Sequence, residues 1–130
     1  MKKPKIQMVV TKEDLGYSAL YDKGDKFIAT QADTFEELKK NILEAVNLSF
    51  EEEGLVYAKD EITFSYDLES FFDFYKVINA KALSERIGMN QSLLAQYIRG
   101  IKKPSPKQTK RILKGVQQIG KELTEAEFIV

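Results

Sequence analysis

Two short helical patterns lie side by side in residues 83–100 of the chain, LSERIGMNQSLLAQYIRG, and they constrain its fold more than any other stretch. Leu83 and Ile87 are four residues apart in the first pattern, and Leu94 and Ile98 repeat this spacing in the second. Residues four apart share one face of a helix. The stretch therefore predicts two short amphipathic helices joined by a tight turn.

The residues between the two patterns predict how the turn is made. Gly88 stands where the first helix must end, a position at which a left-handed backbone suits glycine. Asn90 is placed to cap the second helix, and polar Gln91 and Ser92 follow in its first turn. This layout is that of a helix-turn-helix, whose second helix presents its N-terminal residues to base edges in the major groove of DNA. Two core helices of an ordinary bundle would show the same periodicity.

The run Gly88–Ser92, GMNQS, closely resembles the helix-turn-helix of phage repressor and Cro-type regulators. This resemblance implies that Gln91, Ser92 and Gln96 face the groove, where glutamine can make two hydrogen bonds to adenine. Ala95 is small enough to let the helix approach the bases or to touch a thymine methyl group. The predicted DNA-binding residues are Lys81, Asn90, Gln91, Ser92, Ala95, Gln96, Arg99, Lys102 and Lys103.

The charge around this stretch is strongly positive. Ten basic residues and a single acid, Glu85, lie between Lys76 and Lys114. Arg99, Lys102 and Lys103 are at and after the end of the second helix, where backbone phosphates would lie, and Lys81 could reach a phosphate from the preceding helix. Phosphate contacts would set position and affinity, and the groove-facing side chains would set sequence preference.

The first half of the chain reads as three strands, a helix and a fourth strand. Thr34-Phe35-Glu36-Glu37 has the form of a capping box and opens the helix, which Gly54 ends. The strands are expected at Ile6–Thr11, Tyr17–Tyr21, Phe27–Thr30 and Ile62–Tyr66, the first three forming a meander if successive strands pair.

This order resembles the N-terminal domain of HicB-type antitoxins, through the segments Gly16–Ala19 and Thr34–Leu38. The resemblance implies a truncated ribonuclease H-like fold and, as partner, a small basic HicA-like toxin that cleaves mRNA. One departure is the short connection at Asp22–Lys26, where the family usually has a longer segment rich in proline and containing Gly-Cys.

The second half is predicted to be helical throughout. We expect a helix at Leu68–Ile78 capped by Asp67, a second at Ala80–Ile87 capped by Asn79, the helix Gln91–Arg99, one starting at Pro106, and a short turn after Thr124. The predicted fold is α+β, with a β-β-β-α-β domain at residues 1–66 and an all-α helix-turn-helix domain of four to five helices at residues 67–130.

Composition adds a division of charge and excludes several classes. The formal net charge is zero, but residues 1–69 carry −6 and residues 70–130 carry +6, which suggests two different partners. No apolar run approaches the roughly 20 residues of a membrane helix. The N-terminus does not read as a signal peptide and there is no cysteine, so we expect a cytoplasmic protein without a membrane partner.

An enzyme is not expected, because the chain has neither histidine nor cysteine. Asp14, Asp22, Asp25 and Asp33 read as turn or cap residues and not as a magnesium-binding set. No phosphate-binding glycine motif and no metal-ligand spacing occurs, so no cofactor is expected.

The sequence thus predicts an antitoxin that binds its toxin through the first domain and represses its own operon by binding double-stranded operator DNA through the second. The alternative is a stand-alone repressor whose first domain forms oligomers or senses a small ligand. Repressors of this type mostly bind two half-sites, so we expect a homodimer or a higher even oligomer, with the apolar end Phe128–Val130 as a candidate contact.

Overall fold

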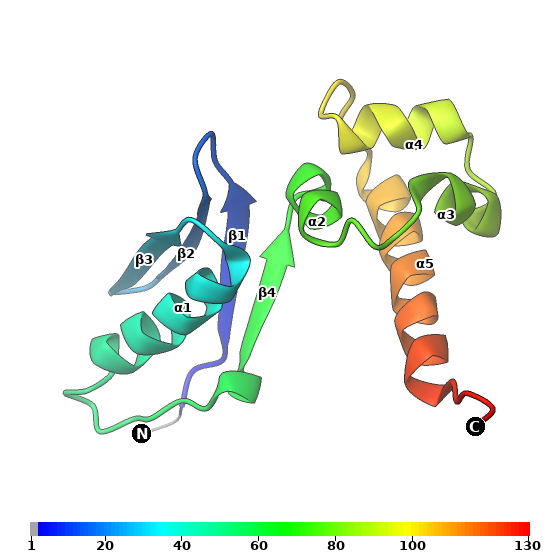
Figure 1. Ribbon diagram of the computed structural model, residues 1–130. Coiled ribbons are helices and arrows are strands. Elements are labelled where there is room, and N and C mark those ends of the chain that lie inside the picture. Colours follow the sequence, from blue (N-terminus) through cyan, green and yellow to red (C-terminus); the bar gives the residue numbers. More distant parts are fainter. Residues whose placement is uncertain (1–2) are drawn as a thin grey trace. The chain divides into compact units, whose positions relative to one another are not determined.

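The computed structural model describes residues 3–130 and contains two compact units, unit 1 (Met1–Phe74) and unit 2 (Tyr75–Val130) (Figure 1). The described chain is α+β, as predicted, with a four-stranded mixed sheet and five α-helices. The elements are β1 (Ile6–Lys12), β2 (Tyr17–Lys23), β3 (Lys26–Ala32), α1 (Phe35–Ser49), the 3-10 turn η1 (Lys59–Glu61), β4 (Ile62–Tyr66), α2 (Leu68–Phe74), α3 (Ala80–Ile87), α4 (Gln91–Ile98) and α5 (Pro106–Glu125).

The sheet of unit 1 has the order β3-β2-β1-β4, which differs from the order of the strands along the chain. The first three strands form the expected antiparallel meander. β4 lies beside β1 and parallel to it, with Ile62 opposite Ile6. A parallel neighbour requires a crossover connection, and the segment containing α1 provides it.

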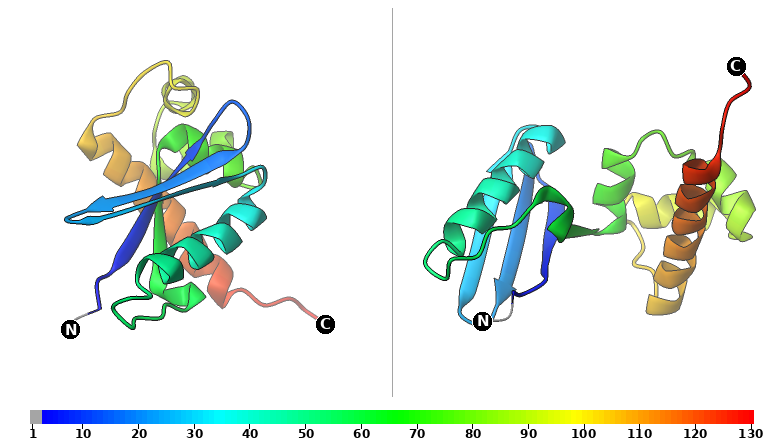
Figure 2. Two further views of the ribbon diagram at one scale, coloured as in Figure 1. Left: turned by 90° about the vertical axis from the view of Figure 1, so that its left-hand side faces the viewer. Right: turned by 90° about the horizontal axis from the view of Figure 1, so that it is seen from below.

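The core of unit 1 lies between the sheet and α1, which runs across one of its faces (Figure 2). Thr34 caps α1 by accepting a hydrogen bond from the amide of Glu37. Leu38, Ile42 and Val46 then recur at helical spacing and are buried against the inward side chains of the strands. These three residues form the buried face of α1, which ends at Ser49, before the Gly54 expected from the sequence.

α2 is attached to the sheet of unit 1 by rings and by hydrogen bonds. Phe74 stacks on Phe35 of α1 with ring centroids 4.5 Å apart. The buried Ser70 Oγ accepts a hydrogen bond from the Lys12 amide at 2.9 Å. The Asp73 carboxylate accepts from Lys12 Nζ at 2.8 Å.

These contacts place the division between the units after Phe74, whereas the sequence analysis placed it after Tyr66. α2 also ends at Phe74 and not at Ile78, and residues 75–78 form a turn in which the Ile78 amide donates to Tyr75 O at 2.9 Å. The sequence predicted a helix here, but it did not show which neighbour covers that helix.

Unit 2 consists of the three helices α3, α4 and α5. The sequence predicted four to five helices for this domain. Its core contains Leu83, Leu94 and Ile112, each about 1 % exposed. Pro106 occupies the first turn of α5 behind the cap Ser105, as predicted for proline.

The predicted turn after Thr124 is absent, because α5 continues to Glu125 and residues 126–130 are not helical. Thr124 does not cap a new helix. Its hydroxyl lies inside the last turn of α5 and donates to Gly120 O at 2.7 Å, an alternative use of a threonine hydroxyl that competes with capping.

Candidate nucleic-acid interface

The local geometry at the start of α4 is fixed by one backbone conformation and two hydrogen bonds. Gly88 ends α3 with φ of 68° and ψ of 34°, the left-handed conformation expected from the sequence. The amide of buried Met89 donates to Ser84 O at 2.8 Å. Asn90 then caps α4, its Oδ1 accepting from the Leu93 amide at 3.1 Å. The turn therefore sets the direction in which α4 leaves it.

α4 has one buried and one exposed face. Leu94 and Tyr97 are buried in unit 2. The opposite face contains residues singled out from the sequence as DNA-binding, and five of these line one shallow surface hollow of about 460 Å³: Gln91, Ser92, Ala95, Gln96 and Arg99. All but half-buried Ala95 are exposed.

The remaining predicted residues lie around this face in different ways. Lys102 and Lys103 are exposed in the loop after α4, which is tied to the helix because the amides of Ile101 and Lys102 both donate to Gln96 O at 3.0 and 3.3 Å. Asn90 is exposed but uses its side-chain oxygen as the cap. Lys81 is exposed in the first turn of α3 and does not line the hollow.

Arg111 has a role that sequence reasoning missed. Its guanidinium group crosses from α5 to the α3–α4 turn, where Nη2 donates to Ile87 O at 2.9 Å and to Gly88 O at 2.7 Å. These carbonyls are at the C-terminal end of a helix, where a cation is favourable. The sequence places Arg111 among other cations of α5, and no local pattern distinguishes it.

One cation of unit 2 is already paired within the chain. Arg86 donates from Nη1 and Nη2 to the two carboxylate oxygens of Glu122, both at 2.9 Å. These hydrogen bonds hold the pKa of Glu122 below the ordinary value of a glutamate. Arg86 is therefore a less suitable phosphate ligand than Arg99, Lys102 and Lys103.

The division of charge becomes sharper at the structural boundary. Unit 1 carries nine basic and sixteen acidic residues, a net charge of −7, and unit 2 carries eleven basic and four acidic residues, a net charge of +7. The exposed face of α4 therefore belongs to the unit with a net positive charge, which favours its association with polyanions.

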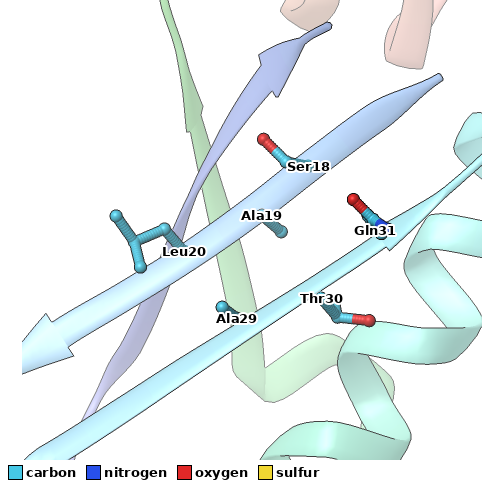
Figure 3. Close-up of a pocket in the computed structure, with 6 residues that line it drawn as sticks. All are labelled: Ser18, Ala19, Leu20, Ala29, Thr30 and Gln31. Carbon is cyan, nitrogen blue, oxygen red and sulfur yellow. The ribbon is translucent and has the colours of Figure 1, made fainter. Parts of the chain in front are cut away.

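Unit 1 has an exposed apolar row on its sheet that the sequence analysis did not single out. Val9, Leu20 and Ala29 lie directly opposite one another on adjacent strands, and all three are exposed. A hollow of about 500 Å³ opens along β2 and β3 beside this row, lined by Ser18, Ala19, Leu20, Ala29, Thr30 and Gln31 (Figure 3). The sequence could have predicted that these residues face away from α1, because successive side chains of a strand point to opposite faces of the sheet.

Comparisons of the chain with protein families, curated proteins and solved structures find no match in any of the three. Among residues 3–130, no helix combines the length and apolarity needed to span a membrane.

Proposed function

We propose that the chain is an antitoxin-type regulator, in which unit 2 binds double-stranded operator DNA and unit 1 binds a small, basic, mRNA-cleaving toxin of the HicA kind. The observation that carries the DNA-binding part is the gathering of Gln91, Ser92, Ala95, Gln96 and Arg99 on the exposed face of α4. The chain itself carries out no catalysis in this proposal.

The chemistry of the α4 face suits base recognition in the major groove. Gln91 and Ser92 are in the first turn of α4, the part that a recognition helix directs at base edges. Gln96 lies one turn further along and, like Gln91, has an amide that can donate to and accept from adenine. Ala95 lies between them, and its small side chain lets the helix approach the base pairs closely.

The charges on both sides of this face suit the phosphate backbone. Arg99 is at the C-cap of α4, and Lys102 and Lys103 extend the positive surface into the next loop. Such contacts carry no sequence information, but they set the position of the helix in the groove. Arg111 supports the arrangement indirectly, since it holds the turn from which α4 starts.

The toxin-binding part rests on the resemblance of Gly16–Ala19 and Thr34–Leu38 to HicB-type antitoxins, and the charge of unit 1 agrees with it. A net charge of −7 would accelerate encounter with a basic partner. The exposed row Val9, Leu20 and Ala29 adds apolar surface of the kind found at the centre of protein interfaces.

The DNA-binding part is tested by fluorescence anisotropy with duplexes from the region upstream of the gene. We expect Gln91→Ala and Gln96→Ala each to weaken specific binding by about 1–3 kcal/mol. Their effect on a scrambled duplex and on the salt dependence should be small. Arg99→Gln should weaken binding to both duplexes and lower the slope of log K against log salt by about one.

Gln117→Ala is the matched control, because Gln117 is an exposed helical glutamine on α5 outside the hollow. If the two α4 variants bind as tightly as the control, α4 is not the recognition helix. A further negative result, no specific duplex bound by the native protein, would reject the DNA-binding function as a whole.

The toxin-binding part is tested by co-expression with the open reading frame adjacent to the gene. A co-purifying basic protein whose growth arrest is relieved by the chain would support the antitoxin. DNA binding without such a partner would instead favour a stand-alone repressor, in which unit 1 forms oligomers or senses a small ligand.

A further inference from the structure

The outer face of α5 carries an apolar ridge. Leu113, Val116, Gly120 and Leu123 follow one another at spacings of three, four and three residues, the period of residues that meet along a helix pair. Leu113 is 51 % exposed and Leu123 is 71 % exposed. Ile112 is the fully buried residue of this helix. Val116 is half-buried, and Leu113 and Leu123 at the two ends of the ridge are left largely uncovered within unit 2.

The two glycines of α5 differ in what surrounds them. A β-carbon on Gly115 would overlap the side chain of Ile87, so α3 and α5 can only approach this closely at a glycine. A β-carbon on Gly120 would meet nothing within 4 Å. Glycine weakens the interior of a helix, and no contact described in the chain requires it at 120. Close approach by another molecule does provide a reason.

We infer that two copies of the chain associate through antiparallel pairing of α5 with α5 of the second copy, about a two-fold axis between Val116 and Gly120. In this register Leu113 lies opposite Leu123 of the other copy, and Val116 lies opposite Gly120 of the other copy. Each large side chain thus meets either a large apolar one or the space above a glycine, as ridges-into-grooves packing requires.

The charges along α5 select the antiparallel direction. Between residues 106 and 121 the helix has only positive charges, at Lys107, Lys110, Arg111, Lys114 and Lys121. The acids follow at Glu122, which is paired with Arg86, and at Glu125 in its last turn, and at Glu127 just beyond it. Antiparallel pairing places the acidic end of each helix beside the basic part of the other. Parallel pairing would bring like charges together and is disfavoured for that reason.

The apolar end of the chain extends the same surface. Phe128, Ile129 and Val130 are almost fully exposed, with exposed fractions of at least 93 %. They follow α5 after Ala126 and Glu127, so antiparallel pairing carries them towards the first half of the partner helix. An exposed apolar tail next to an unpaired apolar ridge marks an interaction surface.

This inference deepens the proposed function, because a two-fold dimer supplies the two α4 helices that a two-part operator needs. The pairing itself does not depend on DNA and is measured without it. Sedimentation equilibrium of the full chain should show a monomer–dimer equilibrium, in which the average molar mass rises with concentration towards twice that of one chain.

The test uses opposite charges placed at the two leucines. Leu113→Glu and Leu123→Lys should each raise the dimer dissociation constant at least about tenfold, because each leaves a charge unpaired in an apolar contact. The double variant Leu113→Glu/Leu123→Lys should recover much of the lost affinity, because antiparallel pairing sets the new acid of one copy against the new base of the other. Leu48→Lys is the matched control, since Leu48 is a 72 % exposed helical leucine in unit 1.

Circular dichroism of each variant shows whether it is folded before its mass is interpreted, and both leucines are exposed enough for folding to be retained. A native protein that stays monomeric overturns the inference, and so does a dimer that Leu123→Lys leaves intact. Weakening by both single changes without recovery in the double variant overturns the antiparallel direction. Dimers that bind no DNA would remove the proposed function alone, and specific DNA binding by a chain that does not pair through α5 would remove this inference alone.

Discussion

Gly16 and Gly24 allow the contribution of one backbone contact to be measured against a matched control. Both lie at connections between strands of the unit 1 sheet, and both have positive φ, 77° and 61°. A β-carbon on Gly24 would meet nothing within 4 Å, whereas one on Gly16 would overlap the carbonyl oxygen of Ala32 and lie 3.1 Å from the Cα atom of Asp33. The two positions therefore share a conformational requirement and differ in their surroundings.

The expected magnitudes follow from this difference. Holding alanine at positive φ costs about 1–2 kcal/mol at either position. At Gly16 the overlap is with backbone that also leads into the Thr34 cap, so it cannot be relieved by rotating a side chain. Overpacking of this kind adds about 1–3 kcal/mol. We therefore expect Gly24→Ala to destabilise unit 1 by about 1 kcal/mol and Gly16→Ala by about 3 kcal/mol.

Native-state hydrogen exchange is the suitable assay, because it reports the opening free energy of the sheet amides in unit 1 separately from the helical amides in unit 2. The amides of unit 2 should be unchanged in both variants and serve as the internal reference. If the opening free energies of the sheet fall by the same amount in the two variants, the close contact between Gly16 and Ala32 has no energetic role and the reasoning fails.

Three further predictions concern single interactions. Arg111→Met should destabilise unit 2 by about 1–2 kcal/mol through the loss of two hydrogen bonds to the α3–α4 turn, whereas Lys114→Met should change the urea midpoint of the helical signal little. The hydrogen bonds from Arg86 lower the pKa of Glu122 in folded unit 2, so they stabilise the fold above the ordinary glutamate pKa, and this stabilisation is lost as the pH falls through the lowered pKa. The urea midpoint of unit 2 should therefore drop less on acidification in Glu122→Gln than in the native chain. Asn47→Ala removes two hydrogen bonds to the backbone of Tyr57, at 3.1 and 2.6 Å, and should lower the opening free energy of unit 1 by about 2 kcal/mol, seen first as faster exchange of the Tyr57 amide.

The helix starts were predictable because capping is local. The side chains of Thr34, Asp67, Asn79 and Asn90 each accept a hydrogen bond from an amide three residues further along the chain. A pattern of this length is visible in the sequence, whatever the rest of the fold does. For α4, helical spacing identified buried Leu94 but paired it with Ile98, which is half-buried, whereas Tyr97 is the second buried residue.

Features that depend on distant residues were not predictable. The sequence analysis assigned α2 to the helical half at residues 67–130, but its position follows from the stacking of Phe74 on Phe35 and from the contacts of Lys12. The anchoring role of Arg111 depends on carbonyls 23 and 24 residues away. At Thr124 the local pattern itself misled. Thr124–Glu127 has the form of a helix start, but α5 continues to Glu125 and the Thr124 hydroxyl donates to Gly120 O inside it.

The parallel pairing of β4 with β1 has a consequence for the order in which the chain folds. Ile6 finds its partner Ile62 only after nearly the whole of unit 1 has been synthesised, so the first strand leaves the ribosome long before one of its neighbours exists. Closing a loop of this length costs entropy before any contact compensates for it, which slows folding. The hairpins β1–β2 and β2–β3 and the three helices of unit 2 depend on contacts between near neighbours in sequence. The joining of β4 to β1 is accordingly the late step of unit 1, during which the edge of β1 stays open to competing strands.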